Sequence, residues 1–366
     1  MLDFTSSLYL GLRHPSHELG GWRSLTIGRP AALGEFTEAK PLARQIAVLT
    51  GTGAAIAVTS ALHGLVDVLE AVVRPGATLV GLDAASYALA QIAVERVSGQ
   101  GTAVVSLTHF DPGAAEQLAT DHPDRRLVLV TDGFCPGCGR FAPVTDLLSI
   151  AGRTGGVVVI DDTQALGIAG KDPSPTDPYG HGGGGTLQRL GVPESGGIVI
   201  VASLAKAFGA PLATIAGPES VIDDINLRGT TRLHASPPAL TALRAAAAAL
   251  HSNAHDGDQR RRRLARRVQM FRDELRSHGL VRIDGGPFPV QAIPVVGDKT
   301  ALSNVRLLRD EGIAAVPIRR RCRTGAAVAL LFRSDHTPAA ARLAANALAY
   351  ATHRASTQAD ASRSSA

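Results

Sequence analysis

Two stretches of the chain decide the fold: residues 156–167 read GVVVIDDTQALG and residues 197–209 read GIVIVASLAKAFG. Each begins with a run of apolar, mostly β-branched residues and continues into polar ones. A short run that is apolar on both faces is typical of a parallel strand covered by helices on both sides. Ligands of open parallel sheets bind beyond the carboxyl ends of the strands. Functional residues are therefore expected directly after these two strands.

The same pattern recurs toward the N-terminus. Further strands are expected over residues 54–59, 78–82, 102–106 and 126–131. Helix-length segments lie between them or follow them, at residues 61–73, 85–97, 113–119 and 144–153. This alternation predicts the α/β class, with an open and mostly parallel sheet.

After about residue 220 the pattern changes to long helices and short strands. Helices are expected at residues 238–251, 258–278, 299–310 and 337–351, with strands at 288–295, 313–318 and 326–332. We predict an N-terminal arm (1–40), a large domain (41–237), a small α+β domain with a linking helix (238–352) and a disordered polar tail (353–366).

Length and composition fit this plan. The chain has 366 residues, of which 45% are hydrophobic, enough for one large and one smaller core. Its uncharged apolar runs are far shorter than the ~20 residues of a membrane span. The N-terminus shows no signal peptide, and three cysteines do not make a disulfide framework. We therefore expect a cytoplasmic protein without a membrane span.

A basic stretch accounts for much of the net charge of +5. It comprises Arg260–Arg263 together with Arg266, Arg267, Arg272 and Arg276. Apolar residues spaced three and four apart run through it, which predicts a long helix with a solvated basic face. A nucleic-acid surface is not expected, because aromatic residues do not interleave with the arginines.

The cysteines offer a weaker motif. Cys135 and Cys138 form a C-x-x-C pair, and Cys322 lies far along the chain. Zinc normally takes four protein ligands in a structural site, and redox pairs begin a helix. The sequence therefore predicts neither a metal site nor a redox role.

Chemistry is indicated where the two deciding strands end. Asp161 follows the first strand, and a carboxylate at a buried strand end is costly without a cationic partner. Lys206 follows the second, and desolvation there lowers the pKa of a lysine and makes its amine nucleophilic. Together they suggest pyridoxal 5′-phosphate (PLP), which needs a lysine for its imine and an acid to keep its ring nitrogen protonated.

Four motifs strengthen this reading. They are DFTSSLYLGL at residues 3–12, TDGF at 131–134, DDTQ at 161–164 and SLAKAFG at 203–209. In this combination the chain resembles the fold-type I PLP enzymes of the class I/II aminotransferase superfamily, nearest to the α-oxoamine synthases. The resemblance implies a large domain with a mostly parallel seven-stranded sheet, a smaller C-terminal α+β domain and PLP as cofactor.

The resemblance also implies roles for individual residues. Lys206 would form the imine with PLP and move the substrate α-proton, and Asp161 would pair with the ring nitrogen. Tyr87 would stack on the ring, and Gln164 would donate a hydrogen bond to the ring hydroxyl. Ser203 would contact the phosphate.

Two further segments are expected at the phosphate. Ser60 and Ala61 open a predicted helix, whose backbone N–H groups are a natural phosphate site. The segment with His234 and Ser236 resembles one that reaches the phosphate of the other subunit, which implies a homodimer with composite active sites.

The expected substrate contacts are Ser7, Asp132 and Arg333. The strand at residues 326–332 lacks the arginine with which the family usually grips a substrate carboxylate. Arg333 directly follows this strand, and Arg319, Arg320, Arg321 and Arg323 precede it. One of these arginines is expected to substitute.

The leading hypothesis is a PLP-dependent acyltransferase. It would condense an amino-acid-derived carbanion with an acyl thioester, carried by CoA or a carrier protein, often with decarboxylation. An aminotransferase on the same scaffold is one alternative, and a catalytically altered relative that acts by binding is another.

Overall fold

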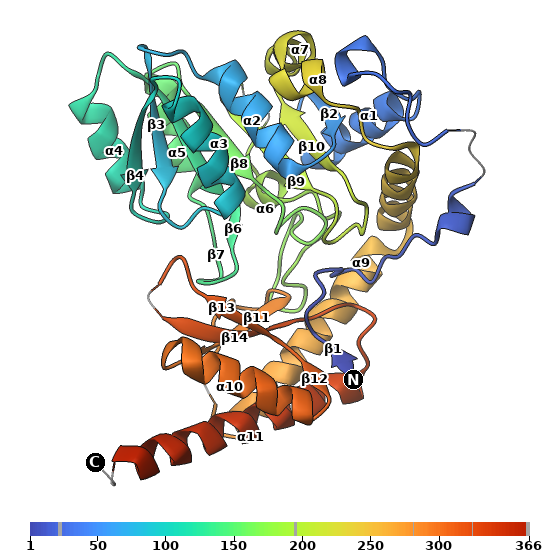
Figure 1. The fold of residues 1–366 in the computed structure, drawn as a ribbon, viewed down its shortest axis with the longest axis vertical. Coiled ribbons are helices and arrows are strands. Elements are labelled where there is room, and N and C mark those ends of the chain that lie inside the picture. Colours follow the sequence, from blue (N-terminus) through green and yellow to red (C-terminus); the bar gives the residue numbers. More distant parts are fainter. Residues whose placement is uncertain (21–23, 194–195, 281, 324, 364–366) are drawn as a thin grey trace.

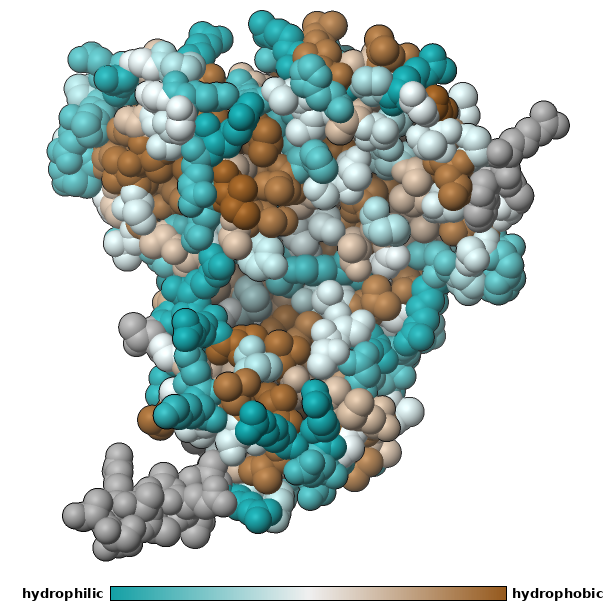
Figure 2. Space-filling view, viewed as in Figure 1, coloured by the Kyte–Doolittle hydropathy of each residue, from teal (hydrophilic) through white to brown (hydrophobic). Residues whose placement is uncertain are grey.

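The computed structural model describes residues 1–20, 24–193, 196–280, 282–323 and 325–363. A large domain and a smaller one lie one above the other, joined along one side by the long helix α9 (Leu240–Ser277) (Figure 1). On the opposite side the molecular outline narrows between the two domains (Figure 2).

The large domain is built on a seven-stranded sheet. Across the sheet the strands are β2 (Ala54–Val58), β10 (Ala213–Gly217), β9 (Ile198–Ser203), β8 (Val157–Asp161), β5 (Arg126–Asp132), β3 (Thr78–Asp83) and β4 (Ala103–Leu107). Only β10 runs antiparallel to its neighbours. The prediction of a mostly parallel seven-stranded sheet is confirmed, and the carboxyl ends of the other six strands share one edge.

Helices cover both faces of this sheet. One face packs against α2 (Ala61–Val72), α3 (Ala88–Ser98) and α7 (Glu219–Arg228). The other packs against α1 (Ala39–Thr50), α4 (Pro112–Asp121), α5 (Val144–Arg153) and the first turns of α9. Side chains alternate accordingly, since Val128 and Val130 of β5 face the first layer, and Leu127 and Leu129 face the second. Each such buried side chain contributes about 1.5–3 kcal/mol, which explains why the strand sequences are apolar throughout.

The small domain is an antiparallel sheet with helices on one side. Its strands and helices are β11 (Val290–Val295), β14 (Ala326–Leu331), β13 (Val316–Arg319), α10 (Gly297–Asp310) and α11 (Pro338–Arg363). The N-terminal strand β1 (Leu2–Asp3) pairs with β12 (Ile313–Ala314), so the arm begins on this domain before it crosses to the large one.

The basic stretch departs from the expectation. The structure has the single helix α9 where two helices were predicted, and Arg261 within it is fully buried. Its guanidinium donates to the Gly167 carbonyl at 2.9 Å and to Asn253 Oδ1 at 2.7 Å. Arg267 donates to the His336 carbonyl at 2.8 Å. The predicted solvated face is therefore wrong for these arginines, which tie α9 to other parts of the chain.

The C-terminal helix also departs from the expectation. Helix α11 continues to Arg363, whereas the sequence predicted a disordered tail from residue 353. Alanine, the strongest helix former, recurs through the helix from Ala339 to Ala351 and favours its propagation. The last three residues of the predicted tail lie outside the described residues. Among the described helices, none has the length and apolar character required to cross a membrane.

Candidate active site

The lysine loop is held by its glycine and by the N-terminal arm. Lys206 lies just beyond β9, and Gly209 three residues later has a φ of +63°. A Cβ on Gly209 would lie 2.6 Å from the Leu12 carbonyl oxygen, so glycine alone fits this close approach. His14 Nε2 lies 2.9 Å from the Phe208 carbonyl oxygen. The arm thereby fixes the loop that presents Lys206.

Lys206 is half-buried, and its amine has no ion-pair partner among the described residues. Of the ion pairs within 4.0 Å that the described residues form, none includes Lys206. Burial lowers the pKa of Lys206, and the negative charges of Asp161 and Asp132 oppose this shift. A lowered pKa raises the fraction of neutral amine, which is the nucleophilic form.

Two carboxyl groups lie at the strand ends beside this lysine. Asp161 of β8 and Asp132 of β5 are paired in register. Asp161 Oδ1 accepts a hydrogen bond from Thr163 N at 3.0 Å, and Asp132 Oδ1 accepts one from Tyr87 N at 3.1 Å. Burial, together with the neighbouring Asp161, raises the pKa of Asp132 to about 7. The structure thus brings Asp161 and Lys206 together at one edge of the sheet, as the sequence predicted, and places Asp132 beside them.

The adjacent Asp162 has a different environment. Its side chain is fully buried and accepts hydrogen bonds from the backbone N–H of Thr186, at 2.9 Å, and from the Thr186 hydroxyl. Burial raises the pKa of Asp162 to about 7. These bonds hold the start of α6 (Thr186–Leu190) against the end of β8. Asp162 therefore serves the fold, whereas Asp161 borders the site.

Gln164 and Ser203 lie in the turns after β8 and at the end of β9. The Tyr9 hydroxyl donates to Gln164 Oε1 at 2.8 Å, which leaves the amide N–H groups of Gln164 to donate elsewhere. Thr163 Oγ1 accepts a hydrogen bond from Ser203 N at 3.0 Å and so joins the two turns. The turn with Ser7 lies beside this group, since Tyr9 N donates to the Ser7 carbonyl at 2.7 Å.

The start of α2 lies on the same edge of the sheet. Ser60 is the N-cap, with Oγ accepting from His63 N at 3.3 Å, and Ala61 is the first helical residue. The Thr59 hydroxyl donates to the Ser236 carbonyl at 3.1 Å, so the segment with Ser236 and the exposed His234 approaches this helix end within the same chain. The predicted reach of this segment into a partner's site stays a prediction.

Tyr87 occupies the space between the lysine and the small domain. It lies between the end of β3 and the start of α3, and it is 53% exposed. Lys206 Nζ and the Arg321 guanidinium carbon each lie 5.8 Å from the centroid of its ring. Arg321 comes from the loop between β13 and β14 and donates to the Ser86 carbonyl at 2.9 Å. Sequence reasoning named Arg321 among several arginines but could not choose it, because its position depends on how the domains pack.

Arg333 was the arginine expected to contact a substrate. Its guanidinium is mostly buried and is engaged by Asp3 Oδ2 at 3.1 Å and by Asp335 Oδ1 at 2.9 Å. These bonds fasten the N-terminal strand to the end of β14. The structure therefore gives Arg333 a place in domain packing, which departs from the predicted substrate contact.

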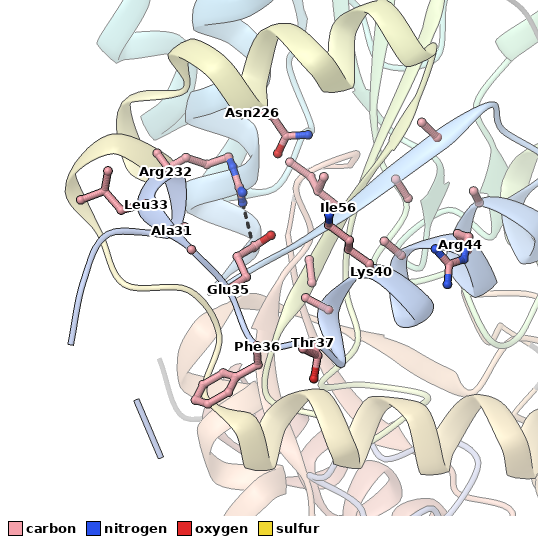
Figure 3. A pocket seen from close by; sticks show the side chains of 18 of the residues that line it. Ala31, Leu33, Glu35, Phe36, Thr37, Lys40, Arg44, Ile56, Asn226 and Arg232 are labelled. Atoms are coloured by element: carbon pink, nitrogen blue, oxygen red, sulfur yellow. Dashed lines mark hydrogen bonds and ion pairs between the residues drawn. The ribbon is translucent and has the colours of Figure 1, made fainter. Parts of the chain in front are cut away.

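A separate cavity lies apart from Lys206. It has a volume of about 780 Å³ and is lined by residues 31–37, the side of α1, part of β2, Asn226 and Arg232. Glu35 and Arg232 form an ion pair of 3.1 Å across its wall (Figure 3). None of the predicted site residues lines this cavity.

Comparisons with known proteins agree with the geometry. The family model for aminotransferase class I and II matches residues 31–329. The 8-amino-7-oxononanoate synthase of Mycobacterium tuberculosis is 29% identical over 227 residues, which is 60% of this chain and 55% of the relative. That of Halorhodospira halophila is 29% identical over 288 residues, 78% of this chain and 67% of the relative. The chain thus spans about half the length of the first of these relatives and two thirds of the second.

Solved structures share the fold. Serine palmitoyltransferase from S. paucimobilis, with a bound PLP–myriocin aldimine, matches with a TM-score of 0.83 at 17% identity, covering 97% of this chain and 88% of that one. The 8-amino-7-oxononanoate synthase of Francisella tularensis matches with a TM-score of 0.74 at 16% identity, covering 97% and 98%. At these identities the likeness concerns the fold.

Proposed function

The chain belongs to the aminotransferase class I and II family, and on this basis we propose that it is a PLP-dependent acyltransferase of the α-oxoamine synthase type. The family confirms the resemblance expected from the sequence. The observation that carries the proposal is Lys206: a half-buried amine without an ion-pair partner among the described residues, facing the exposed ring of Tyr87 beside Asp161.

The residues present fit PLP. A planar pyridine ring needs a flat apolar face, and the Tyr87 ring is 53% exposed next to Lys206. A pyridine nitrogen needs an acid, which Asp161 offers at the end of β8. A phosphate needs N–H donors, which the N-terminus of α2 offers after Ser60, and Ser203 lies at the end of β9 in the same sheet. Gln164 has N–H groups left to donate to a ring hydroxyl.

When bound, PLP supplies an electron sink for the pair released at the substrate Cα. The protein's own groups direct this chemistry. Asp161 would keep a proton on the ring nitrogen, because a carboxylate beside that nitrogen favours its charged form. Lys206 would bind the cofactor and then take and return the proton at the substrate Cα, for which its lowered pKa is suited.

Arg321 is our candidate for the missing carboxylate-binding arginine. Its guanidinium carbon lies 5.8 Å from the centroid of the Tyr87 ring, the same distance as Lys206 Nζ. Among the described residues, the Ser86 carbonyl is the one hydrogen-bond acceptor of this guanidinium, so its other N–H groups can bind a substrate. A guanidinium binds a carboxylate through two parallel hydrogen bonds. We therefore propose that Arg321, rather than Arg333, orients an amino-acid substrate.

The second substrate would be an acyl thioester. The names of the relatives support this class, since both 8-amino-7-oxononanoate synthase and serine palmitoyltransferase recur among the matches.

We also propose a cytoplasmic homodimer in which the segment with His234 and Ser236 completes the partner's phosphate site. Mixing Lys206→Ala chains with Ser236 variants should restore activity in mixed dimers if the sites are composite.

A direct test is borohydride reduction of the PLP-loaded protein followed by peptide mapping. We expect the cofactor mass on the peptide that contains Lys206. Cofactor on another lysine, or no visible absorbance after reconstitution, would overturn the proposal and favour a relative that acts by binding alone.

The reaction is tested with a panel of amino acids, each with and without acyl-CoA. An acyltransferase should release CoA only when both substrates are present, and the cofactor should end each cycle in its aldehyde form. Conversion of the cofactor to its amine form by an amino acid alone would instead identify an aminotransferase.

A further inference from the structure

Four side chains with metal-binding atoms meet beside the candidate active site. They are His109, Cys135, Cys138 and Cys322, and one ligand atom from each lies within 4.8 Å of all the others. The sequence predicted no metal site, because Cys322 lies far along the chain from the C-x-x-C pair. The fold brings Cys322 next to this pair in space, so the separation along the sequence does not exclude a metal site.

The four residues come from both domains. His109 follows β4, and Cys135 and Cys138 lie in the hairpin of β6 (Phe134–Cys135) and β7 (Arg140–Phe141). Cys322 belongs to the small-domain loop between β13 and β14. Figure 1 shows this hairpin projecting from the large domain toward β13. The cluster therefore spans the contact between the domains.

We propose that these residues bind one zinc ion in a closed Cys₃His site. In a tetrahedral site with Zn–S distances of about 2.3 Å and Zn–N distances of about 2.0 Å, neighbouring ligand atoms lie about 3.5–3.8 Å apart. Cys138 Sγ and His109 Nε2 lie 3.5 Å apart, which matches this spacing. Three thiolates and one imidazole are a typical structural zinc set, and they leave no open position for a substrate.

The orientation of His109 is already that of a ligand. Its Nδ1 lies 2.9 Å from Asp83 Oδ1, and Asp83 also accepts hydrogen bonds from Ala85 N at 2.8 Å and Phe110 N at 3.0 Å. Donation from Nδ1 to this fixed carboxylate places the proton on Nδ1 and leaves the Nε2 lone pair directed at the cysteines. A histidine ligand held by a carboxylate in this way is common around protein-bound zinc.

The hairpin turn is shaped to admit the third cysteine. A Cβ on Gly137 would lie 2.7 Å from Cys322 Sγ and 3.7 Å from Cys135 Sγ. Only a glycine at this position lets Cys322 approach the C-x-x-C pair. Gly139, with a φ of +72°, donates its N–H to the Cys135 carbonyl at 2.8 Å and closes the turn. The backbone thus brings the sulfur atoms of all three cysteines together.

Zinc in this cluster would also affect the candidate active site, a consequence that rests on the proposed function. Cys322 directly follows Arg321, whose guanidinium lies over Tyr87. Zinc bound to Cys322 and to the large-domain ligands would hold this loop in place. The ion would therefore act as a clamp between the domains that keeps Arg321 in position, and it would take no part in bond making or breaking.

The test is the metal content of the untagged protein, produced with added zinc and analysed by plasma mass spectrometry. We expect about one zinc per chain, and a loss of most of it in Cys322→Ser and in His109→Gln. His122→Asn, which changes an exposed histidine outside the cluster, is the matched control and should keep the metal. Lys206→Ala should also keep it, so failure of the proposed function and failure of the metal site are distinguishable.

Cobalt substitution of the wild-type protein tests the site without any variant, so a folding defect has no influence on the result. Cobalt bound by three thiolates in a tetrahedral site should give intense visible bands together with sulfur-to-metal charge-transfer absorption. A protein with no stoichiometric metal and three thiols that react freely would overturn the proposal. A mass lower by two hydrogens, showing a disulfide among these cysteines, would overturn it as well.

Discussion

The Lys206 site and the cysteine cluster lie at the same edge of one sheet, yet they are built in opposite ways. Around Lys206 the groups are spread out: the amine has no ion-pair partner among the described residues, and the Tyr87 ring is 53% exposed. In the cluster, four ligand atoms lie within 4.8 Å of one another. The first arrangement offers an amine and an exposed ring to a molecule, and the second holds four ligand atoms close enough to share one ion.

At this edge of the sheet, the two sites are alike in the polar groups that follow the strands and unlike in the contacts that the small domain makes. Strand ends deliver polar groups in both places, Asp161 and Lys206 in one and Asp83 and His109 in the other. What differs is the contribution of the small domain. It supplies Cys322 to close one site and Arg321 to border the other, so a single loop connects them.

The largest effect is expected at the centre of the open site. Lys206→Ala should lower kcat by about 10³-fold or more, because it removes the only group proposed to bind the cofactor covalently. Lys299→Ala, on the exposed face of α10, is the matched control and should keep its rate. Steady-state kinetics of the reconstituted proteins measure the effect, and near-normal rates in Lys206→Ala would refute the assignment.

The neighbouring aspartates separate catalysis from stability. Asp161→Asn should lower kcat by about 10²-fold or more with little change in unfolding free energy, since a neutral partner no longer holds the proton on the ring nitrogen. Asp162→Asn should chiefly lower the unfolding free energy, by about 1–3 kcal/mol, because buried Asp162 bonds Thr186. Urea unfolding measures the unfolding free energy of both variants, and steady-state kinetics measure their kcat. The reverse pattern would show that the two roles are exchanged.

These two sites also show how far the sequence could predict the molecule. The β-branched runs identified β8 and β9, and the polar residues after them identified Asp161 and Lys206, because those signals are local. The antiparallel β10, with the sequence ATIAG, was missed because small residues give a weak strand signal. Arg321 and Cys322 could not be assigned, since only the packing of the small domain brings them to the sheet edge.

Arg321 tests the border of the open site. Arg321→Ala should raise KM for the amino-acid substrate by about 10–100-fold, the loss expected for charge-assisted hydrogen bonds of about 1.5–3 kcal/mol. Arg323→Ala, whose guanidinium pairs with Asp284 at 3.6 Å, is the matched control. Equal effects of the two substitutions on KM would indicate a general charge effect and would remove Arg321 from the site.

The shared loop predicts that the closed site acts on the open one through Arg321. Cys322→Ser should raise KM less than Arg321→Ala does, by several-fold, while kcat changes little. In the Arg321→Ala background the further change should disappear, because residues that act through one another are not additive. A double-variant kinetic cycle measures this coupling. Additive effects would show that the two sites are independent despite their common loop.

The smallest expected effect concerns Asp132 in the cofactor-free protein. Its pKa of about 7 lies above the ordinary value of 3.8, so the folded chain holds an extra proton between these values. Unfolding free energy therefore falls as pH rises through this window. Asp132→Asn removes this contribution. From about pH 5 to about pH 8, the unfolding free energy of the variant should therefore fall less than that of the wild type, by on the order of 2 kcal/mol.

Urea unfolding at the two pH values measures the difference. Asp162 contributes a slope of the same sign, but it does so in both proteins and cancels. Asp146→Asn, at an exposed position of α5, controls for the loss of one negative charge and should follow the wild type. Parallel pH profiles for wild type and Asp132→Asn would mean that Asp132 is solvated like a surface carboxylate. Because burial is what raises the pKa of Asp132, this outcome would mean that water reaches Asp132 in the Lys206 site more freely than its position at the sheet edge implies.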